Sequence, residues 1–401
     1  MNALHMPELQ RVCILGATGS VGTSTLDVIS RHPDRFDVFA LTAHSRVDDL
    51  FRQCVQWRPR FAALPGTAQA AELRARLKTH GVATEVLAGA QALCDLAAHP
   101  EVDSVMAAIV GAAGLGPCLA AARAGKRLLL ANKEALVVGG ALFMNAVHEG
   151  GATLLPIDSE HSAIFQCLPE DRAGWPRRID HILLTSSGGP FRQRDPATMS
   201  GITPDEACAH PNFAMGRKIS VDSATMMNKA LEVIEARWLF ELAPEQIRVV
   251  IHPQQIVHSM VVCRDNSVLA QLGTPDMRVP ISYGLSFPER IESGASPLDF
   301  TTLSALTFEA PDFKRYPGLA LAWETLRGAE GSTTVLNAAN ETAVAAFLAG
   351  TIRFDQIHSV IAHALERVDA RSAGSDTLDA LLEIDQRARR QASQFVKGLA
   401  P

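Results

Sequence analysis

The sequence predicts an α/β protein with a doubly wound parallel sheet at its N-terminal end, a central α+β region and a C-terminal bundle of helices. Over the first 150 residues, short apolar runs alternate with helical patterns, which is typical of a parallel sheet. From Val249 the pattern changes to two apolar runs joined by Arg264-Asp265-Asn266, which predicts a hairpin in a mixed or antiparallel sheet. After Pro317 the pattern is that of amphipathic helices over 318–327, 340–348 and 354–370.

The composition excludes several classes of protein. A chain of 401 residues suggests two or three domains, and a net charge of −6, from 37 basic and 43 acidic residues, disfavours a nucleic-acid binder. Seven scattered cysteines without a C-x-x-C pair indicate reduced thiols and a cytoplasmic protein. Residues 105–122 carry no charge, but their glycines and Pro117 predict a strand, a turn and a helix instead of a membrane span. Residues 1–10 lack a signal-peptide pattern.

A glycine-rich turn follows the first strand. Arg11–Leu15 is apolar and leads into Gly16–Gly22, and a helix is predicted over Thr23–Arg31. The spacing of these glycines is by itself weak and often marks only a tight turn. Between a strand and a helix, however, such a turn lets backbone N–H groups approach a pyrophosphate, so we predict a Rossmann-type dinucleotide site.

The end of the second strand, Phe36–Ala43, indicates which dinucleotide binds. The strand is followed by His44, Ser45 and Arg46 instead of an acidic residue that would bind the ribose hydroxyls of NAD. Arginine and serine suit the 2′-phosphate of NADPH. An ordinary loop arginine beside Asp48 and Asp49 is the alternative.

Charged residues follow two later strands at the edge where a doubly wound sheet binds its ligands. Asn132, Lys133 and Glu134 come directly after the apolar run 128–131. Asp158 and Glu160 follow the run 154–157, and in an extended segment both would point to the same side. Two such carboxylates favour a shared hard cation, Mg²⁺ or Mn²⁺. The alternative is a helix N-cap with an acidic first turn.

The central stretch holds a candidate phosphate site and a candidate flap. Ser187 stands before two glycines, which allow close backbone approach, although such a sequence alone is typical of a turn. The apolar segment His210–Gly216 is bounded by a proline and a glycine, as expected of a flap that closes over a substrate. His258 could face a ligand, but a hydrogen-bonded sheet histidine is the simpler interpretation.

A helix in this stretch carries three polar residues on one face. We predict a short strand near 218–221 and a helix from about Ser223 to Phe240. Asn228, Lys229 and Glu232 are three or four residues apart and therefore share a face. An ordinary Lys–Glu pair would explain the charges, but not their position beside an uncharged, methionine-rich turn.

With these pieces placed, the chain resembles the 1-deoxy-D-xylulose 5-phosphate reductoisomerase family from Arg11 onward. The motifs that carry the resemblance are GATGSVG at 16–22, ANKEAL at 131–136, PIDSEH at 156–161, SGGPF at 187–191, HPNFAMGRKISVDSATMMNKALE at 210–232 and NAANE at 337–341. Members reduce and rearrange deoxyxylulose phosphate to 2-C-methyl-D-erythritol 4-phosphate in the non-mevalonate isoprenoid pathway. The resemblance implies NADPH, a divalent cation (Mg²⁺, Mn²⁺ or Co²⁺), a sugar phosphate substrate and a homodimer.

The resemblance also implies a role for each matching residue. The implied metal ligands are Asp158, Glu160 and Glu232. The implied substrate contacts are Lys133, Ser159, Glu160, Ser187, His210, Ser223, Asn228, Lys229 and Glu232. The implied NADPH contacts are Thr18, Gly19, Ser20, Val21, Asn132, Glu134 and Gly216, joined by His44, Ser45 and Arg46 from the strand argument. The implied catalytic groups are Lys133, His210, Lys229 and the three metal ligands.

Three domains follow from the pattern and the resemblance: a Rossmann-like NADPH domain (1–157), a catalytic and connective domain with the metal site, flap and dimerisation sheet (158–311), and a helical domain (312–401).

Phe213 replaces a tryptophan that many members carry on the flap, and residues 44–46 differ from the usual family sequence. A simple NADP-dependent semialdehyde or hydroxy-acid dehydrogenase is the alternative, but it leaves the three carboxylates without a role. A non-catalytic NADPH-sensing protein is a further alternative, disfavoured because the metal and lysine positions are intact.

Overall fold

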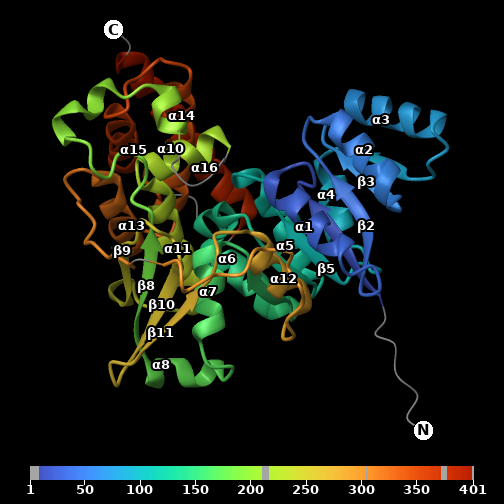
Figure 1. Ribbon diagram of the computed structural model, residues 1–401. Coiled ribbons are helices and arrows are strands. Elements are labelled where there is room, and N and C mark those ends of the chain that lie inside the picture. The colour runs from blue at the N-terminus through green and yellow to red at the C-terminus, as the bar shows by residue number, and fades with distance from the viewer. Residues whose placement is uncertain (1–8, 210–215, 304, 372–376, 400–401) are drawn as a thin grey trace. The chain divides into compact units, whose positions relative to one another are not determined.

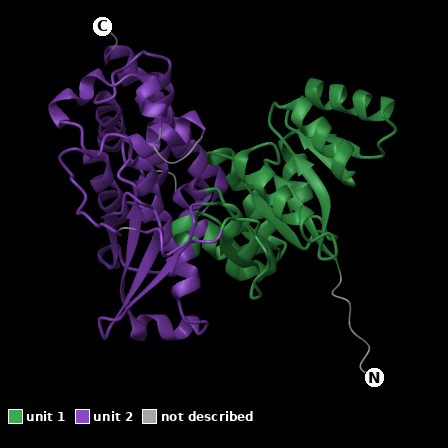
Figure 2. Ribbon diagram, viewed as in Figure 1, with its two compact units in different colours: residues 1–132, 143–162, 276–296 green, residues 133–142, 163–275, 297–401 purple. Residues whose placement is uncertain are grey.

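The computed structural model describes residues 9–209, 216–303, 305–371 and 377–399. The chain forms two compact units, each built from separate segments (Figure 2). Unit 1 consists of residues 1–132, 143–162 and 276–296, and unit 2 of residues 133–142, 163–275 and 297–401. Within the described ranges, no helix has both the length and the apolar character that a bilayer crossing requires.

Unit 1 contains the predicted doubly wound sheet. Its seven strands are all parallel and lie in the order β4-β3-β2-β1-β5-β6-β7. The strands are β1 (Gln10–Leu15), β2 (Phe36–Thr42), β3 (Phe61–Leu64), β4 (Glu85–Ala88), β5 (Ser104–Ala107), β6 (Arg127–Leu130) and β7 (Thr153–Pro156). The connecting helices are α1 (Ser20–Ser30), α2 (Val47–Trp57), α3 (Thr67–Thr79), α4 (Ala90–Ala97), η1 (Ala112–Gly114) and α5 (Leu115–Arg123).

The strand order reverses beside β1, which pairs with both β2 and β5. Because parallel crossovers are right-handed, a reversal places the helices before and after it on opposite faces of the sheet. In agreement, α2 packs on α3 and α4 packs on α5. A ligand crevice is expected at the carboxyl ends of β1 and β5, where the connections diverge.

A late segment returns to this sheet. Helix α12 (Arg278–Ser286) packs against α1, β6 and β7. Gly284 allows this close packing, because a Cβ there would lie 2.5 Å from the Leu129 side chain. An ion pair of 3.1 Å between Arg278 and Asp27 ties the segment to α1. Residues 276–296 therefore belong to the nucleotide-binding fold, although they follow it by more than 100 residues in the chain.

Unit 2 contains the predicted hairpin in a mixed sheet. The strands lie in the order β11-β10-β8-β9, with β8 and β9 parallel and the other pairs antiparallel. Their bounds are β8 (Ile179–Ser186), β9 (Ile247–Ile251), β10 (Val257–Cys263) and β11 (Val268–Leu272). Two short helices precede β8, namely η2 (Arg172–Gly174) and α8 (Trp175–Arg178). Three others lie between β8 and β9: η3 (Pro196–Gly201), α9 (Pro204–Cys208) and η4 (Pro244–Gln246).

The three predicted C-terminal helices are confirmed, α16 is a further helix that was not predicted, and α14, α15 and α16 pack together (Figure 1). The bounds are α13 (Pro317–Arg327), α14 (Ser332–Leu348), α15 (Gln356–Arg367) and α16 (Leu378–Leu399). The predicted start of α14 at Asn340 was wrong by eight residues. Residues 333–340 are all buried, so these first two turns have no amphipathic pattern from which a helix could be predicted.

Candidate active site

The glycine turn after β1 has the geometry of a nucleotide-binding loop. Gly16 has a φ of +83°, and a Cβ there would lie 2.6 Å from the Ala108 carbonyl oxygen, at the end of β5. Only glycine therefore fits at the point where the sheet order reverses. Helix α1 begins at Ser20 with Gly19 as its N-cap, so the N–H groups of its first turn stand at this edge. Thr18, in the turn, is buried.

The loop proposed to read the 2′-phosphate is accessible. His44, Ser45 and Arg46 are exposed and immediately precede α2. Arg46 forms an ion pair of 3.5 Å with Asp49, which also pairs with Arg52. An exposed ion pair contributes little to stability, so Arg46 can turn to a phosphate at small cost.

Asn132 closes the same edge of the sheet at the end of β6. Its side-chain amide donates to the carbonyl oxygens of Ile109 and Gly111, the latter at 3.0 Å. The side chain is buried, and Gly114 is needed beside it, since a Cβ there would lie 2.4 Å from the Asn132 amide nitrogen. Asn132 thus holds the loop after β5 in position.

Asp158 and Glu160 follow β7 as predicted, but the expectation of an extended segment was wrong. Helix α7 (Ser159–Cys167) begins directly after Asp158, whose carbonyl oxygen accepts from the Ser162 N–H at 2.8 Å. Glu160 therefore lies in the first helical turn, the arrangement of the N-cap alternative. The two carboxylates nevertheless have oxygens within 4.8 Å of each other. The helix start, not strand alternation, brings them together, because short polar side chains favour that position.

In unit 2, the carboxylate of Glu232 is held by three polar side chains. Helix α11 (Met227–Phe240) carries Asn228, Lys229 and Glu232 on one face, as predicted. Lys229 and Asn228 both donate to Glu232. Lys133, at the start of α6 (Lys133–Gly150), donates to Glu232 at 3.0 Å and to Asn228 at 2.9 Å. Glu232, Lys229 and Lys133 are all buried, so these charges interact in a poorly solvated environment.

The predicted helix from Ser223 to Phe240 is in fact two helices. Helix α10 (Arg217–Ala224) replaces the expected strand near 218–221, and Met226, with a φ of +62°, separates it from α11. The β-branched Ile219 and Val221 suggested a strand. Packing of α10 against α9 and α14 overrides that propensity.

The break places Ser223 against the Ser187 loop. Gly188 and Gly189 have φ values of +80° and +68°, and a Cβ at Gly189 would lie 2.7 Å from the Ser223 carbonyl oxygen. The Ser187 hydroxyl accepts from the Gly189 N–H at 3.1 Å, and the Tyr316 hydroxyl donates to the Gly188 carbonyl oxygen at 2.8 Å. The Ser187 loop is therefore fixed by these contacts in a conformation that suits phosphate binding. Tyr316 contributes to it, and the sequence did not predict this contribution.

Two further groups that sequence reasoning did not assign form an ionic network with Glu134. Lys218 lies 2.9 Å from the Glu134 carboxylate and 2.8 Å from that of Asp222, which is 1% exposed. Burial alone would lower the pKa of Lys218, but the two carboxylates outweigh it and raise that pKa above its ordinary value. Burial opposes ionisation of Glu134, yet Lys218 holds its pKa below the usual range. The i,i+4 spacing of Lys218 and Asp222 brings the two side chains together only in a helix, and a strand was predicted there.

Four further predicted residues are His210, Phe213, Gly216 and His258. His210 and Phe213 lie outside the described residues. Gly216 is exposed and is the N-cap of α10. His258 lies in β10, and burial lowers its pKa, while backbone hydrogen bonds at Gly273 and Thr274 act in the opposite direction. A hydrogen-bonded sheet histidine is thus the interpretation that its surroundings support.

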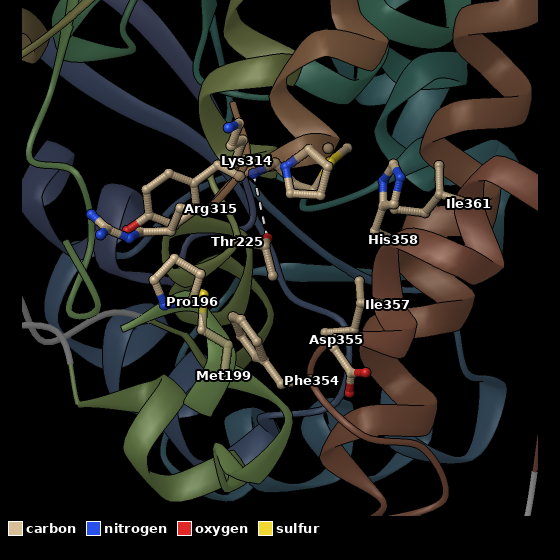
Figure 3. A pocket seen from close by; sticks show the side chains of 14 residues that line it. Pro196, Met199, Thr225, Lys314, Arg315, Phe354, Asp355, Ile357, His358 and Ile361 are labelled. Atoms are coloured by element: carbon tan, nitrogen blue, oxygen red, sulfur yellow. Dashed lines mark hydrogen bonds between the residues drawn. The ribbon is translucent and has the colours of Figure 1, made fainter. Parts of the chain in front are cut away.

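A cavity of about 150 Å³ in unit 2 lies next to the break between α10 and α11. Pro196 and Met199 lie on one side of it, and Ile357, His358 and Ile361 of α15 on the other (Figure 3). Its lining includes Tyr316, which holds the Ser187 loop, but none of the sequence-predicted site residues that the structure describes. The cavity therefore lies between elements that support the site, and we assign no ligand to it.

Three family models match this chain. Their descriptions are 1-deoxy-D-xylulose 5-phosphate reductoisomerase at residues 12–140, the 1-deoxy-D-xylulose 5-phosphate reductoisomerase C-terminal domain at 154–240, and the DXP reductoisomerase C-terminal domain at 272–391. Together they cover well over half of the sequence. The chain belongs to the 1-deoxy-D-xylulose 5-phosphate reductoisomerase family.

Individual members of the reductoisomerase family match over nearly the whole chain. The protein of that name from Aromatoleum aromaticum is 61% identical over 388 residues, covering 96% of each sequence. The one from Cupriavidus necator is 60% identical over 393 residues, covering 98% of this chain and 99% of the relative.

Solved structures of reductoisomerases are similar to this chain in both fold and sequence. A DOX-P reductoisomerase in complex with NADPH, fosmidomycin and magnesium has a TM-score of 0.94 at 45% identity, covering 97% of this chain and 98% of the other. The Zymomonas mobilis enzyme in complex with NADPH has a TM-score of 0.91 at 45% identity, covering 98% and 100%. The α/β fold with a mixed sheet and a helical C-terminal region is therefore that of the family.

Proposed function

We propose that this protein is the reductoisomerase that converts 1-deoxy-D-xylulose 5-phosphate to 2-C-methyl-D-erythritol 4-phosphate in the non-mevalonate isoprenoid pathway, using NADPH and a divalent cation. The observation that carries this proposal is the cluster of Lys133, Asn228 and Lys229 around the buried Glu232. Hydride transfer alone does not require such a set. A reaction that rearranges the carbon skeleton of a phosphorylated hydroxyketone does, because it develops charge on oxygens that must be stabilised.

We assign the pyrophosphate of NADPH to the loop around Gly16, and this assignment is supported by the positive φ of Gly16 and by the start of α1 directly after the loop. We assign Arg46 and its neighbours in the exposed loop to the 2′-phosphate. The further cofactor contacts that we propose are Thr18, Gly19, Ser20, Val21, His44, Ser45, Asn132, Glu134 and Gly216. When bound, NADPH supplies the hydride that reduces the aldehyde produced by the rearrangement.

The donor set for the cation consists of the carboxylates of Asp158, Glu160 and Glu232. Carboxylate oxygens without histidine or cysteine suit Mg²⁺ or Mn²⁺ better than zinc or copper. When bound, the cation stabilises negative charge on neighbouring carbonyl and hydroxyl oxygens of the substrate. Ser159, whose hydroxyl donates to Glu160, is then a substrate contact next to these ligands.

Most of the residues that we assign to binding and orienting the substrate belong to unit 2. We assign its phosphate and hydroxyl contacts to Ser187, Ser223, Asn228 and Lys229, together with His210. Binding of the phosphate supplies remote binding energy that orients the reacting carbons. The ammonium groups of Lys133 and Lys229 are buried donors that can hold a substrate oxyanion or move a proton at it. The protein is proposed to act as a cytoplasmic homodimer, as the family resemblance implies.

The decisive assay follows NADPH absorbance with deoxyxylulose phosphate in the presence and absence of a chelator. We expect substrate-dependent oxidation of NADPH that stops on chelation and returns with added Mg²⁺ or Mn²⁺. Oxidation that is unaffected by chelation, or that occurs only with a semialdehyde or hydroxy-acid partner, would instead support a simple dehydrogenase.

Replacing Arg46 with alanine tests the cofactor assignment. The variant should raise the KM for NADPH by about tenfold or more and leave the KM for NADH nearly unchanged, because only NADPH carries the 2′-phosphate. Arg52→Ala is the matched control, since Arg52 shares the Asp49 ion pair and is also exposed. Equal effects on both cofactors would remove Arg46 from the 2′-phosphate site.

A further inference from the structure

Asn340, in the NAANE motif, makes an unusual contact in the middle of α14. Its side chain is fully buried and donates from Nδ2 to the Asp222 carboxylate at 2.9 Å. Its Oδ1 is also buried and has no hydrogen-bond partner among the described residues. A buried acceptor without a partner destabilises the fold, so an apolar side chain of similar shape would be the better choice for packing alone. The contact with Asp222 therefore calls for another explanation.

The Asp222 carboxylate is held from two directions. Asn340 binds Oδ1, and Lys218 binds Oδ2 at 2.8 Å while also holding Glu134 at 2.9 Å. With both oxygens engaged, the carboxylate cannot rotate. This pair of contacts ties the last turn of α10 to α14 and to the first turn of α6.

The residue that follows Asp222 is Ser223, which packs through its carbonyl oxygen on Gly189 of the Ser187 loop. The backbone carbonyl of Asp222 also accepts from the Thr225 hydroxyl at 3.2 Å, within the break between α10 and α11. A shift of Asp222 would move Ser223 directly, because no flexible residue separates them. Positioning errors of about 1 Å at a binding residue are enough to reduce activity strongly.

We propose that Asn340 is a positioning residue for the substrate, which sets the place of Ser223 by holding the Asp222 carboxylate. This inference rests on the proposed function, in which Ser223 contacts the sugar phosphate. It also gives the NAANE motif a role, because Asn340 of this motif fixes the last turn of α10, which carries Ser223.

The test compares Asn340→Leu with Asn337→Leu. Asn337 is equally buried, one turn earlier on α14, but donates to Glu341 at 3.2 Å instead of to Asp222. Asn340→Leu should raise the KM for deoxyxylulose phosphate by about tenfold, the loss expected for one hydrogen bond to a charged group, and change the KM for NADPH by less than about threefold. Asn337→Leu should leave both KM values unchanged. Melting temperatures of both variants separate folding defects from this effect. Equal KM changes in the two variants would overturn the proposal.

A double-mutant cycle with Ser223→Ala shows whether Asn340 acts through Ser223. In the Ser223→Ala background, Asn340→Leu should change the KM for the sugar phosphate by less than about twofold, because the contact that it positions is already lost. A full tenfold effect in that background would overturn the inference and leave the proposed function intact. If Ser223→Ala alone does not raise this KM, the substrate assignment of Ser223 fails, and the inference fails with it.

Discussion

Replacing Glu232 with glutamine is expected to lower kcat by about a thousandfold, with the affinity for NADPH preserved within about twofold. The substitution removes a proposed cation ligand, and a cation contributes several kcal/mol to stabilising charge in the transition state, where each 1.4 kcal/mol is worth about tenfold in rate. It also leaves the buried ammonium groups of Lys133 and Lys229 without the carboxylate that they share. Most of the proposed NADPH contacts lie on unit 1, and none of them is Lys133, Asn228 or Lys229, which hold Glu232, so NADPH binding should persist.

This prediction is checked by measuring kcat over a range of Mg²⁺ concentrations and NADPH binding by nucleotide fluorescence. Glu241→Gln is the matched control, because Glu241 is the exposed C-cap residue of the same helix and pairs only with Arg172 among the ion pairs of the described residues. It should retain full activity. Undiminished turnover of Glu232→Gln at ordinary Mg²⁺ concentrations would refute the role of Glu232 as a ligand.

Replacing Gly189 with alanine is expected to lower kcat/KM for deoxyxylulose phosphate by about a hundredfold, mainly through KM. The new Cβ would lie 2.7 Å from the Ser223 carbonyl oxygen, a backbone atom that cannot turn aside. The φ of +68° adds strain of about 1–2 kcal/mol for any residue with a Cβ. The loop and Ser223 must therefore separate, which misplaces two of the proposed phosphate contacts together.

Steady-state kinetics with both substrates and a melting curve test this prediction. The KM for NADPH should change little, since the cofactor contacts at Gly16 lie on the other unit. Gly201→Ala is the control, because a Cβ at Gly201 meets no atom within 4 Å and needs no positive φ. An unchanged KM for the sugar phosphate in Gly189→Ala would show that the close approach to Ser223 is not needed for binding.

Much of the fold could be predicted because its signals are local. The strand at Arg11–Leu15, the glycine turn after it and the hairpin after Val257 depend on apolar runs and turn residues that lie next to each other. The errors occurred where packing overrides local preference. Residues 218–221 are helical despite their β-branched side chains, and α14 begins eight residues before its predicted start because its first turns are buried all round.

In the candidate site, too, some features follow from local sequence and others only from packing. Its residue types were readable from the sequence and from the family resemblance, and the shared face of Asn228, Lys229 and Glu232 follows from helical spacing alone. Asp158 and Glu160 have oxygens near each other because of the start of α7, which the sequence argument gave only as the alternative to an extended segment. The prediction that these two carboxylates lie close together is confirmed, whereas the predicted extended conformation of the segment was wrong.

By itself, the sequence determined the parallel sheet, the nucleotide loop and the identity of the charged groups, because these depend on short-range patterns and on chemistry carried by each residue type. Only the tertiary structure decided which polar and charged side chains pair with one another. Lys133 reaches Glu232 across 99 positions of the chain, and Asn340 reaches Asp222 across 118. Such pairs are set by how helices pack, a property of the whole core that no local pattern encodes.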